Sequence, residues 1–105
     1  MPADRLRTPD VERLLVALRA LKTDDEVYAF LQDVCTVREI HDMAQRLAVA
    51  RMLAAGEHYE HVREVTGAST TTISRVSRCL HYGAGGYETV IDRVRPDETG
   101  KPGER

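Results

Sequence analysis

Two short amphipathic segments joined by a single glycine constrain the fold of this chain more than any other feature. The first segment has apolar side chains at three-residue spacing, the spacing of one helix face: Tyr59, Val62 and Val65. Gly67 follows, and glycine readily adopts the left-handed conformation that commonly ends a helix. Ser69 then stands where the N-cap of a second helix is expected. The pattern predicts a helix-turn-helix over about residues 58–81.

The second helix of this motif has the composition of a groove-binding helix. Short hydroxyls and guanidinium groups surround an inward row of Ile73, Val76 and Leu80. No Asp or Glu occurs from Val65 to Tyr87, although the whole chain has a formal net charge of −2. The acid-free window concentrates positive charge at this helix, which allows its N-terminal residues to enter the major groove of DNA.

Two alternatives to DNA binding remain open at the level of sequence. A Ser/Thr-rich amphipathic helix after a glycine turn can be a solvent-facing helix in a bundle. The scaffold can also serve as a helical protein-interaction module without specific DNA binding, with aromatic contact residues at Tyr59, His81, Tyr82 and Tyr87. Ordinary core or dimer packing accounts better for these aromatic residues.

The remaining helices are marked by their N-terminal signals. Thr8-Pro9-Asp10 starts a first helix, and capping boxes at Thr23–Glu26 and Thr36–Glu39 start two more. The third helix is expected from about Val37 to Ala55, and a last one from about Tyr87 to Val94. The glycine-rich segment between His81 and Gly86 is expected to be a turn. The result is an all-α chain of six helices.

Length and composition bound the domain organisation. At 105 residues, the chain is expected to form one all-helical domain over residues 1–95, followed by a disordered tail over 96–105, where Pro, Gly and charge dominate. One Phe and no Trp limit the core, and several helices are short. Burial against a second copy of the chain is therefore expected, giving a homodimer.

Several classes of site and location are disfavoured. Cys35 and Cys79 lack the paired spacing of a zinc site and are expected to be buried or half-buried thiols. His58 and His61 are three apart, but a solvated helix start explains them better than a metal site does. No catalytic constellation is present, so an enzyme is not expected. The absence of a signal peptide and of a membrane-length apolar run predicts a cytoplasmic protein without a membrane partner.

Three stretches in fixed order carry a resemblance. The first stretch contains Arg46-Leu47 and Leu53-Ala54-Ala55-Gly56-Glu57. The second is segment 66–75, and the third is segment 78–87, which has a cluster of glycines near its end. Over about Leu14 to Val94 the chain resembles the tryptophan repressor family, and in particular its YerC/YecD-like branch. The resemblance implies a six-helix Trp-repressor-like fold in an intertwined dimer. It also implies a sequence-specific transcriptional regulator, a repressor, whose two recognition helices enter successive major grooves of double-stranded DNA.

The resemblance also assigns DNA-contacting residues. Thr70, Thr71, Thr72 and Ser74 fall where the family contacts bases and phosphates, partly through water. The predicted DNA-binding set is Arg63, Ser69, Thr70, Thr71, Thr72, Ser74, Arg75 and Arg78. For Arg63, a phosphate contact and an ion pair with Glu60 or Glu64 are both open. Glu60 and His61 replace polar and basic contacts of the repressor, so a different operator sequence is expected.

A ligand pocket is implied as well. Arg75 and Arg46 fall where the family places two arginines on opposite faces of an indole ligand, and Cys79 falls near a serine that faces the amino group of that ligand. The implied pocket is therefore Arg46, Arg75 and Cys79, with L-tryptophan or a related small molecule as corepressor. From the residues alone, the two arginines can instead hold DNA phosphates or pair with acids such as Asp42. A thiol is also a poorer partner for an ammonium group than a hydroxyl.

Overall fold

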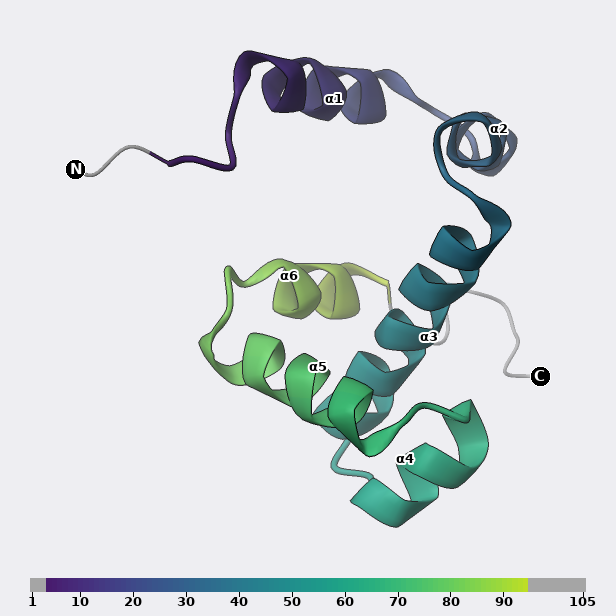
Figure 1. The fold of residues 1–105 in the computed structure, drawn as a ribbon, viewed down its shortest axis with the longest axis vertical. Coiled ribbons are helices and arrows are strands. Elements are labelled where there is room, and N and C mark those ends of the chain that lie inside the picture. Colours follow the sequence, from purple (N-terminus) through teal and green to yellow (C-terminus); the bar gives the residue numbers. More distant parts are fainter. Residues whose placement is uncertain (1–3, 95–105) are drawn as a thin grey trace. The chain divides into compact units, whose positions relative to one another are not determined.

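The computed structural model describes residues 4–94, which form six helices and no strand. The helices are α1 Pro9–Ala20, α2 Asp24–Val34, α3 Val37–Ala54, α4 Tyr59–Thr66, α5 Thr70–Tyr82 and α6 Gly86–Arg93 (Figure 1). The predicted all-α class and helix number are confirmed over these residues. The chain divides into two compact units with the boundary after Ile40. The predicted disordered tail at 96–105 lies outside the described residues.

The predicted N-terminal signals of the first three helices are confirmed. Threonine hydroxyls accept hydrogen bonds from the third residue after them at α1 and α2, with Thr8 bonded to Val11 and Thr23 bonded to Glu26. At the start of α3 the capping box is reciprocal. The Thr36 hydroxyl accepts from the Glu39 amide at 3.1 Å, and the Glu39 carboxylate accepts from the Thr36 amide at 2.8 Å. These local bonds satisfy amides that a helix start otherwise leaves unpaired.

The first unit has apolar helix faces without a core of their own. Neither α1 nor α2 contains a buried residue. Leu14 and Leu18 on α1 remain 40% exposed, and Leu15 remains 42% exposed. Because an amphipathic helix is normally stabilised by burying its apolar stripe, these faces lack the packing that such a stripe requires.

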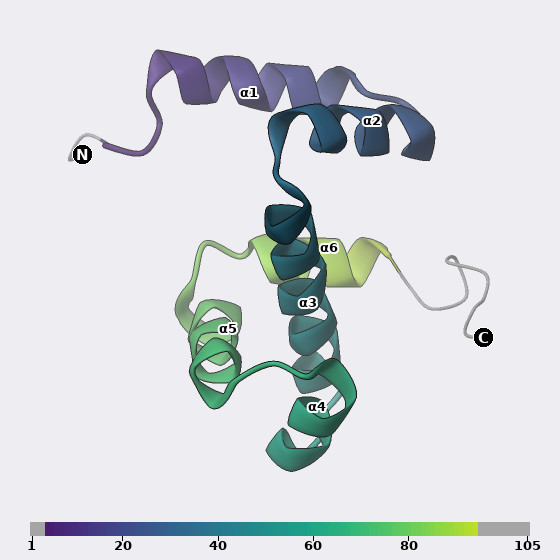
Figure 2. The same ribbon diagram turned by 45° about the vertical axis from the view of Figure 1, so that its right-hand side comes forward.

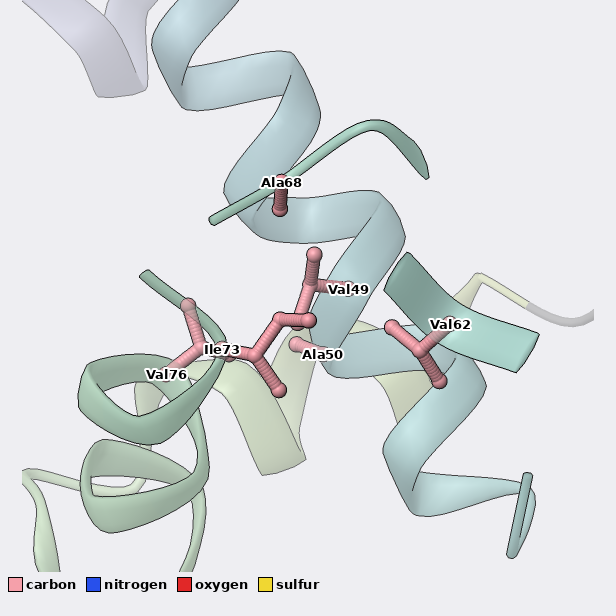
Figure 3. Close-up of a cluster of buried hydrophobic side chains, with 6 residues drawn as sticks. All are labelled: Val49, Ala50, Val62, Ala68, Ile73 and Val76. Carbon is pink, nitrogen blue, oxygen red and sulfur yellow. The ribbon is translucent and has the colours of Figure 1, made fainter. Parts of the chain in front are cut away.

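The second unit contains the hydrophobic core. It joins α3, α4 and α5 through six buried residues: Val49, Ala50, Val62, Ala68, Ile73 and Val76 (Figure 3). Figures 1 and 2 show α4 and α5 beside the C-terminal part of α3. Tyr87 and Ile91 of α6 pack against the same cluster. The core therefore fixes the helix-turn-helix against α3.

One predicted face is wrong. Val65 is 61% exposed and Tyr59 is 42% exposed, whereas Val62 between them is fully buried. Three residues of an α-helix turn through about 300°, so side chains at three-residue spacing are offset from one another by about 60° around the helix axis. Tyr59 and Val65 therefore point to either side of the direction of Val62. In a helix of eight residues the packing contact is narrow, and α4 buries Val62 together with the partly buried Thr66.

Two further predictions, one of a helix boundary and one of the burial of a thiol, also need correction. Helix α5 continues through His81 and Tyr82, so the glycine turn is confined to residues 83–85. The Gly83 amide donates to the Cys79 carbonyl at 2.9 Å, which extends the helical hydrogen bonding to that point. The Cys79 thiol is exposed rather than buried or half-buried, while Cys35 is half-buried as predicted. The buried residues of α5 are Ile73 and Val76, and Cys79 lies outside this buried set.

A matched pair of substitutions on α4 tests this packing. Val62→Ala is expected to lower the free energy of unfolding by about 2 kcal/mol, because it removes two buried carbons and leaves a cavity. Val65→Ala makes the same change at an exposed position and is expected to cost less than about 0.5 kcal/mol. Urea denaturation at one fixed protein concentration measures both. Equal losses would contradict the described face of α4.

Candidate nucleic-acid interface

The turn between α4 and α5 is built from local hydrogen bonds around one glycine. Gly67 has φ +73°, and its amide donates to the Arg63 carbonyl at 2.9 Å. The Thr66 hydroxyl donates to the Val62 carbonyl at 2.7 Å and accepts from the Ala68 amide at 3.2 Å. Ala68 is buried, which anchors the turn to the core. The helix-turn-helix predicted over about residues 58–81 is therefore present, with its glycine in the predicted conformation.

The start of α5 separates the predicted hydroxyl residues into two groups. The Ser69 hydroxyl accepts from the Thr72 amide at 3.1 Å and bonds to the Thr72 hydroxyl at the same distance. The Ser69 and Thr72 side chains therefore stabilise the first turn of α5. Thr70, Thr71 and Ser74 are exposed and make no side-chain hydrogen bond to any described residue. Their hydroxyls are therefore available to an external partner.

The arginine side chains on α5 form no ion pair among the described residues, although Asp42 of α3 lines the same cavity as Arg75. Arg75 and Arg78 are both exposed, and neither forms an ion pair with a residue in the described range 4–94. Arg63 on α4 differs, because its guanidinium lies 3.1 Å from the Glu60 carboxylate. Both side chains of that pair are more than half exposed, and such surface pairs contribute little to stability. A phosphate can therefore replace Glu60 as the partner of Arg63 at small cost.

A polar cavity lies between α3 and α5. It has a volume of about 290 Å³ and is lined by Asp42, Gln45, Arg46, Thr71, Thr72 and Arg75. Two of the three residues predicted for a ligand pocket, Arg46 and Arg75, thus line one cavity from different helices. Cys79 is not among the lining residues. The volume lies just below the range of about 300–1,000 Å³ that is usual for ligand pockets.

Sequence reasoning did not identify Gln45. This side chain lines the polar cavity and also donates from Nε2 to the Thr66 carbonyl at 3.1 Å. A glutamine in the middle of a helix gives no local signal, because its partner lies 21 residues away in sequence. Only the packing of α3 against the turn brings the two groups together.

The sequence of this chain matches a known protein family. The model of the Trp repressor protein family matches residues 10–95. The chain belongs to the Trp repressor family. It is 48% identical over 99 residues to the uncharacterized protein YerC of Bacillus subtilis (strain 168), covering 94% of this chain and 95% of YerC.

Two solved structures share the Trp repressor-like fold. A TrpR-like protein from Eubacterium eligens is 49% identical, with a TM-score of 0.81 over 85% of this chain and 92% of that one. A candidate Trp repressor from Staphylococcus aureus is 41% identical, with a TM-score of 0.82 over 89% of this chain and 93% of that one. The predicted family and fold are therefore confirmed.

A second cavity of this Trp repressor-like chain is apolar. It has a volume of about 490 Å³ and is lined by residues of α3, α6 and the segments that follow them: Ala48, Arg51, Met52, Ala54, Ala55, Glu57, Ile91 and Val94. The described residues contain no group of three or more side chains that could hold a metal ion. Within the same range, no helix has the length and apolarity needed to cross a membrane.

A matched pair of serines on α5 tests the capping geometry. Ser69→Ala is expected to lower the free energy of unfolding by about 1 kcal/mol, because it removes the hydroxyl that caps the Thr72 amide. Ser74→Ala, on the exposed middle of the same helix, is expected to leave stability unchanged or slightly higher, because alanine favours helices. Thermal denaturation followed by circular dichroism measures both variants. If Ser74→Ala is the more destabilising change, the assignment of Ser69 as the cap is wrong.

Proposed function

We propose that this protein is a sequence-specific DNA-binding transcriptional regulator, acting as a repressor, that reads the major groove through α5. The observation that carries the proposal is the composition of one exposed helix face. Thr70, Thr71 and Ser74 present free hydroxyls, and Arg75 and Arg78 present guanidinium groups that lack carboxylate partners among the described residues. Membership of the Trp repressor family supports the same function.

The proposed contacts divide by chemistry. Short hydroxyls on the first turns of α5 suit base edges, which carry the sequence information. The guanidinium groups of Arg63, Arg75 and Arg78 suit phosphates, which supply affinity and its salt dependence. Ser69 and Thr72 contribute by fixing the helix start, where unpaired backbone amides also favour a phosphate.

A homodimer is part of the proposal. The apolar faces of α1 and α2 bury no residue within the described chain, and α3 and α6 leave an apolar cavity. A second copy of the chain supplies apolar surface for both, since leucines that are 40% exposed gain free energy when covered. Two copies also give two recognition helices for two half-sites.

Selection of random duplexes by the purified full chain tests the function. The expected result is an enriched palindromic motif whose half-sites lie about one helical turn apart. Sedimentation equilibrium on the same preparation is expected to give twice the chain mass of 11.8 kDa. Recovery of no motif, with and without added L-tryptophan, would overturn the proposed DNA-binding function. A non-repeated motif would overturn the dimeric arrangement only.

Two substitutions are expected to have different effects on the selected duplex. Arg78→Ala should weaken binding to all duplexes and reduce the slope of affinity against salt by about 1, because one phosphate contact is lost. Thr71→Ala should change the preference between the selected duplex and a half-site variant by about 1 kcal/mol, with little change in salt slope. Arg93→Ala on α6 is the charge-matched control. Fluorescence anisotropy at several salt concentrations separates these results, and unchanged binding in both variants would refute the assigned face.

The polar cavity is proposed as the site of a small-molecule corepressor. Arg46 and Arg75 line it from α3 and α5, so a ligand between them contacts both the scaffold and the recognition helix. A ligand that binds the DNA-competent state more tightly shifts the population toward it. L-tryptophan or a related indole is the first candidate, because arginine stacks on aromatic rings.

Calorimetry tests this ligand site. L-tryptophan is expected to release or absorb measurable heat and to raise the melting temperature of the full chain, because a ligand that binds only the folded state stabilises it. Arg46→Ala should reduce both effects, whereas Arg51→Ala, which removes the same charge elsewhere on α3, should not. No heat and no shift in melting temperature with tryptophan or other indoles would remove these ligands.

A second candidate function rests on Tyr82. This side chain is 87% exposed at the end of α5, and its ring lies 6.2 Å from that of His81. Exposed tyrosines are frequent anchors of protein interfaces. If the selection of duplexes fails, stoichiometric recovery of one protein partner, lost in Tyr82→Ala, would support a helical protein-interaction module instead.

A further inference from the structure

The side chain of Gln45 makes a hydrogen bond unlike the others in this protein. Its Nε2 on α3 donates to the carbonyl of Thr66, 21 residues away, at 3.1 Å. Every other side-chain hydrogen bond among residues 4–94 joins residues at most five positions apart. Gln45 is therefore the one polar side chain in that range whose hydrogen bond joins two different helices, α3 and α4.

The acceptor of this hydrogen bond, the Thr66 carbonyl, lies where α4 ends and the turn of the helix-turn-helix begins. Thr66 is the last residue of α4, and helix ends leave carbonyl groups without partners inside the helix. Gly67 then takes the left-handed conformation that redirects the chain toward α5. The Gln45 amide thus holds the chain two residues before the buried Ala68 and three before the N-cap Ser69.

Apolar packing alone does not fix where the turn between α4 and α5 lies along α3. Ile73 and Val76 fix α5 against α3, but apolar contacts are not directional. A hydrogen bond requires a narrow range of distance and angle, so it specifies where the turn lies along α3. A partly buried carbonyl that loses its donor also carries a desolvation cost, which disfavours other positions of the turn.

Gln45 also lines the polar cavity with Thr71, Thr72 and Arg75 of α5. One amide N–H is used by Thr66, and no other described residue bonds to the second N–H or to the carbonyl oxygen. The same side chain therefore contacts the turn and borders the proposed recognition helix from the α3 side.

We propose that Gln45 is a positioning residue for DNA recognition: its hydrogen bond to the Thr66 carbonyl sets the turn and, through it, the placement of α5 in the groove. This inference rests on the proposed DNA-binding function. Gln45 itself touches no DNA in this scheme. Its loss should therefore reduce discrimination between sequences and leave the phosphate contacts intact.

Gln45→Met tests the inference, because methionine has similar length and volume but no donor. In the full chain, affinity for the selected duplex should fall by about three- to tenfold, the equivalent of one ordinary hydrogen bond. Affinity for an unrelated duplex and the salt slope should stay unchanged. Gln45→Glu keeps the shape, removes the donor at neutral pH and should lose at least as much discrimination. Gln32→Met makes the identical change on α2 and serves as the control.

Amide hydrogen exchange without DNA gives a second readout. Exchange at Gly67 and Ala68 should be about three- to tenfold faster in Gln45→Met than in the parent protein, while Val49 and Ile73 keep their protection. Equal discrimination and equal exchange in parent and variant would overturn the positioning role alone. A parent protein that selects no duplex would overturn the proposed function and, with it, any role of Gln45 in recognition. Parallel loss of affinity for selected and unrelated duplexes would show a general structural defect and would also overturn the proposal.

Discussion

The contact of α5 with α3 is the interaction on which the rest of the second unit depends. Ile73 lies beside Val49 and Ala50, as Figure 3 shows, and Val76 belongs to the same buried cluster. Because this contact buries only the apolar side of α5, the hydroxyls of Thr70, Thr71 and Ser74 and the guanidinium groups of Arg75 and Arg78 remain exposed. The availability of the candidate interface is thus a direct result of which side of α5 is apolar.

Features determined by neighbouring residues were predictable from the sequence. Gly67, the Ser69 cap and the Thr36–Glu39 capping box act over three or four residues, and each is found as expected. The six helices follow from the same local signals together with the period of the apolar residues. The end of α5 was not predicted correctly, because the helix includes His81 and Tyr82 before the glycine turn begins.

Features determined by distant contacts were not predictable in the same way. The exposure of Val65 and Cys79 depends on which side of a short helix meets α3, and helical spacing alone does not specify that side. Gln45 has no distinguishing neighbours, yet it forms the long-range hydrogen bond to the turn. For the candidate site, the hydroxyl residues were predicted as one group. The structure divides them into Ser69 and Thr72, which bond to each other, and Thr70, Thr71 and Ser74, which are free.

The buried core of the described residues contains no polar or charged side chain. Its contribution to folding therefore has no titrating group and little dependence on ionic strength, whereas contacts between guanidinium groups and phosphates weaken steeply as salt rises. The stability of the core and the strength of the phosphate contacts can therefore be varied independently within one molecule. Ionic strength thus acts as a selective probe of the surface of α5, because the helix itself is held in place by interactions that salt does not screen.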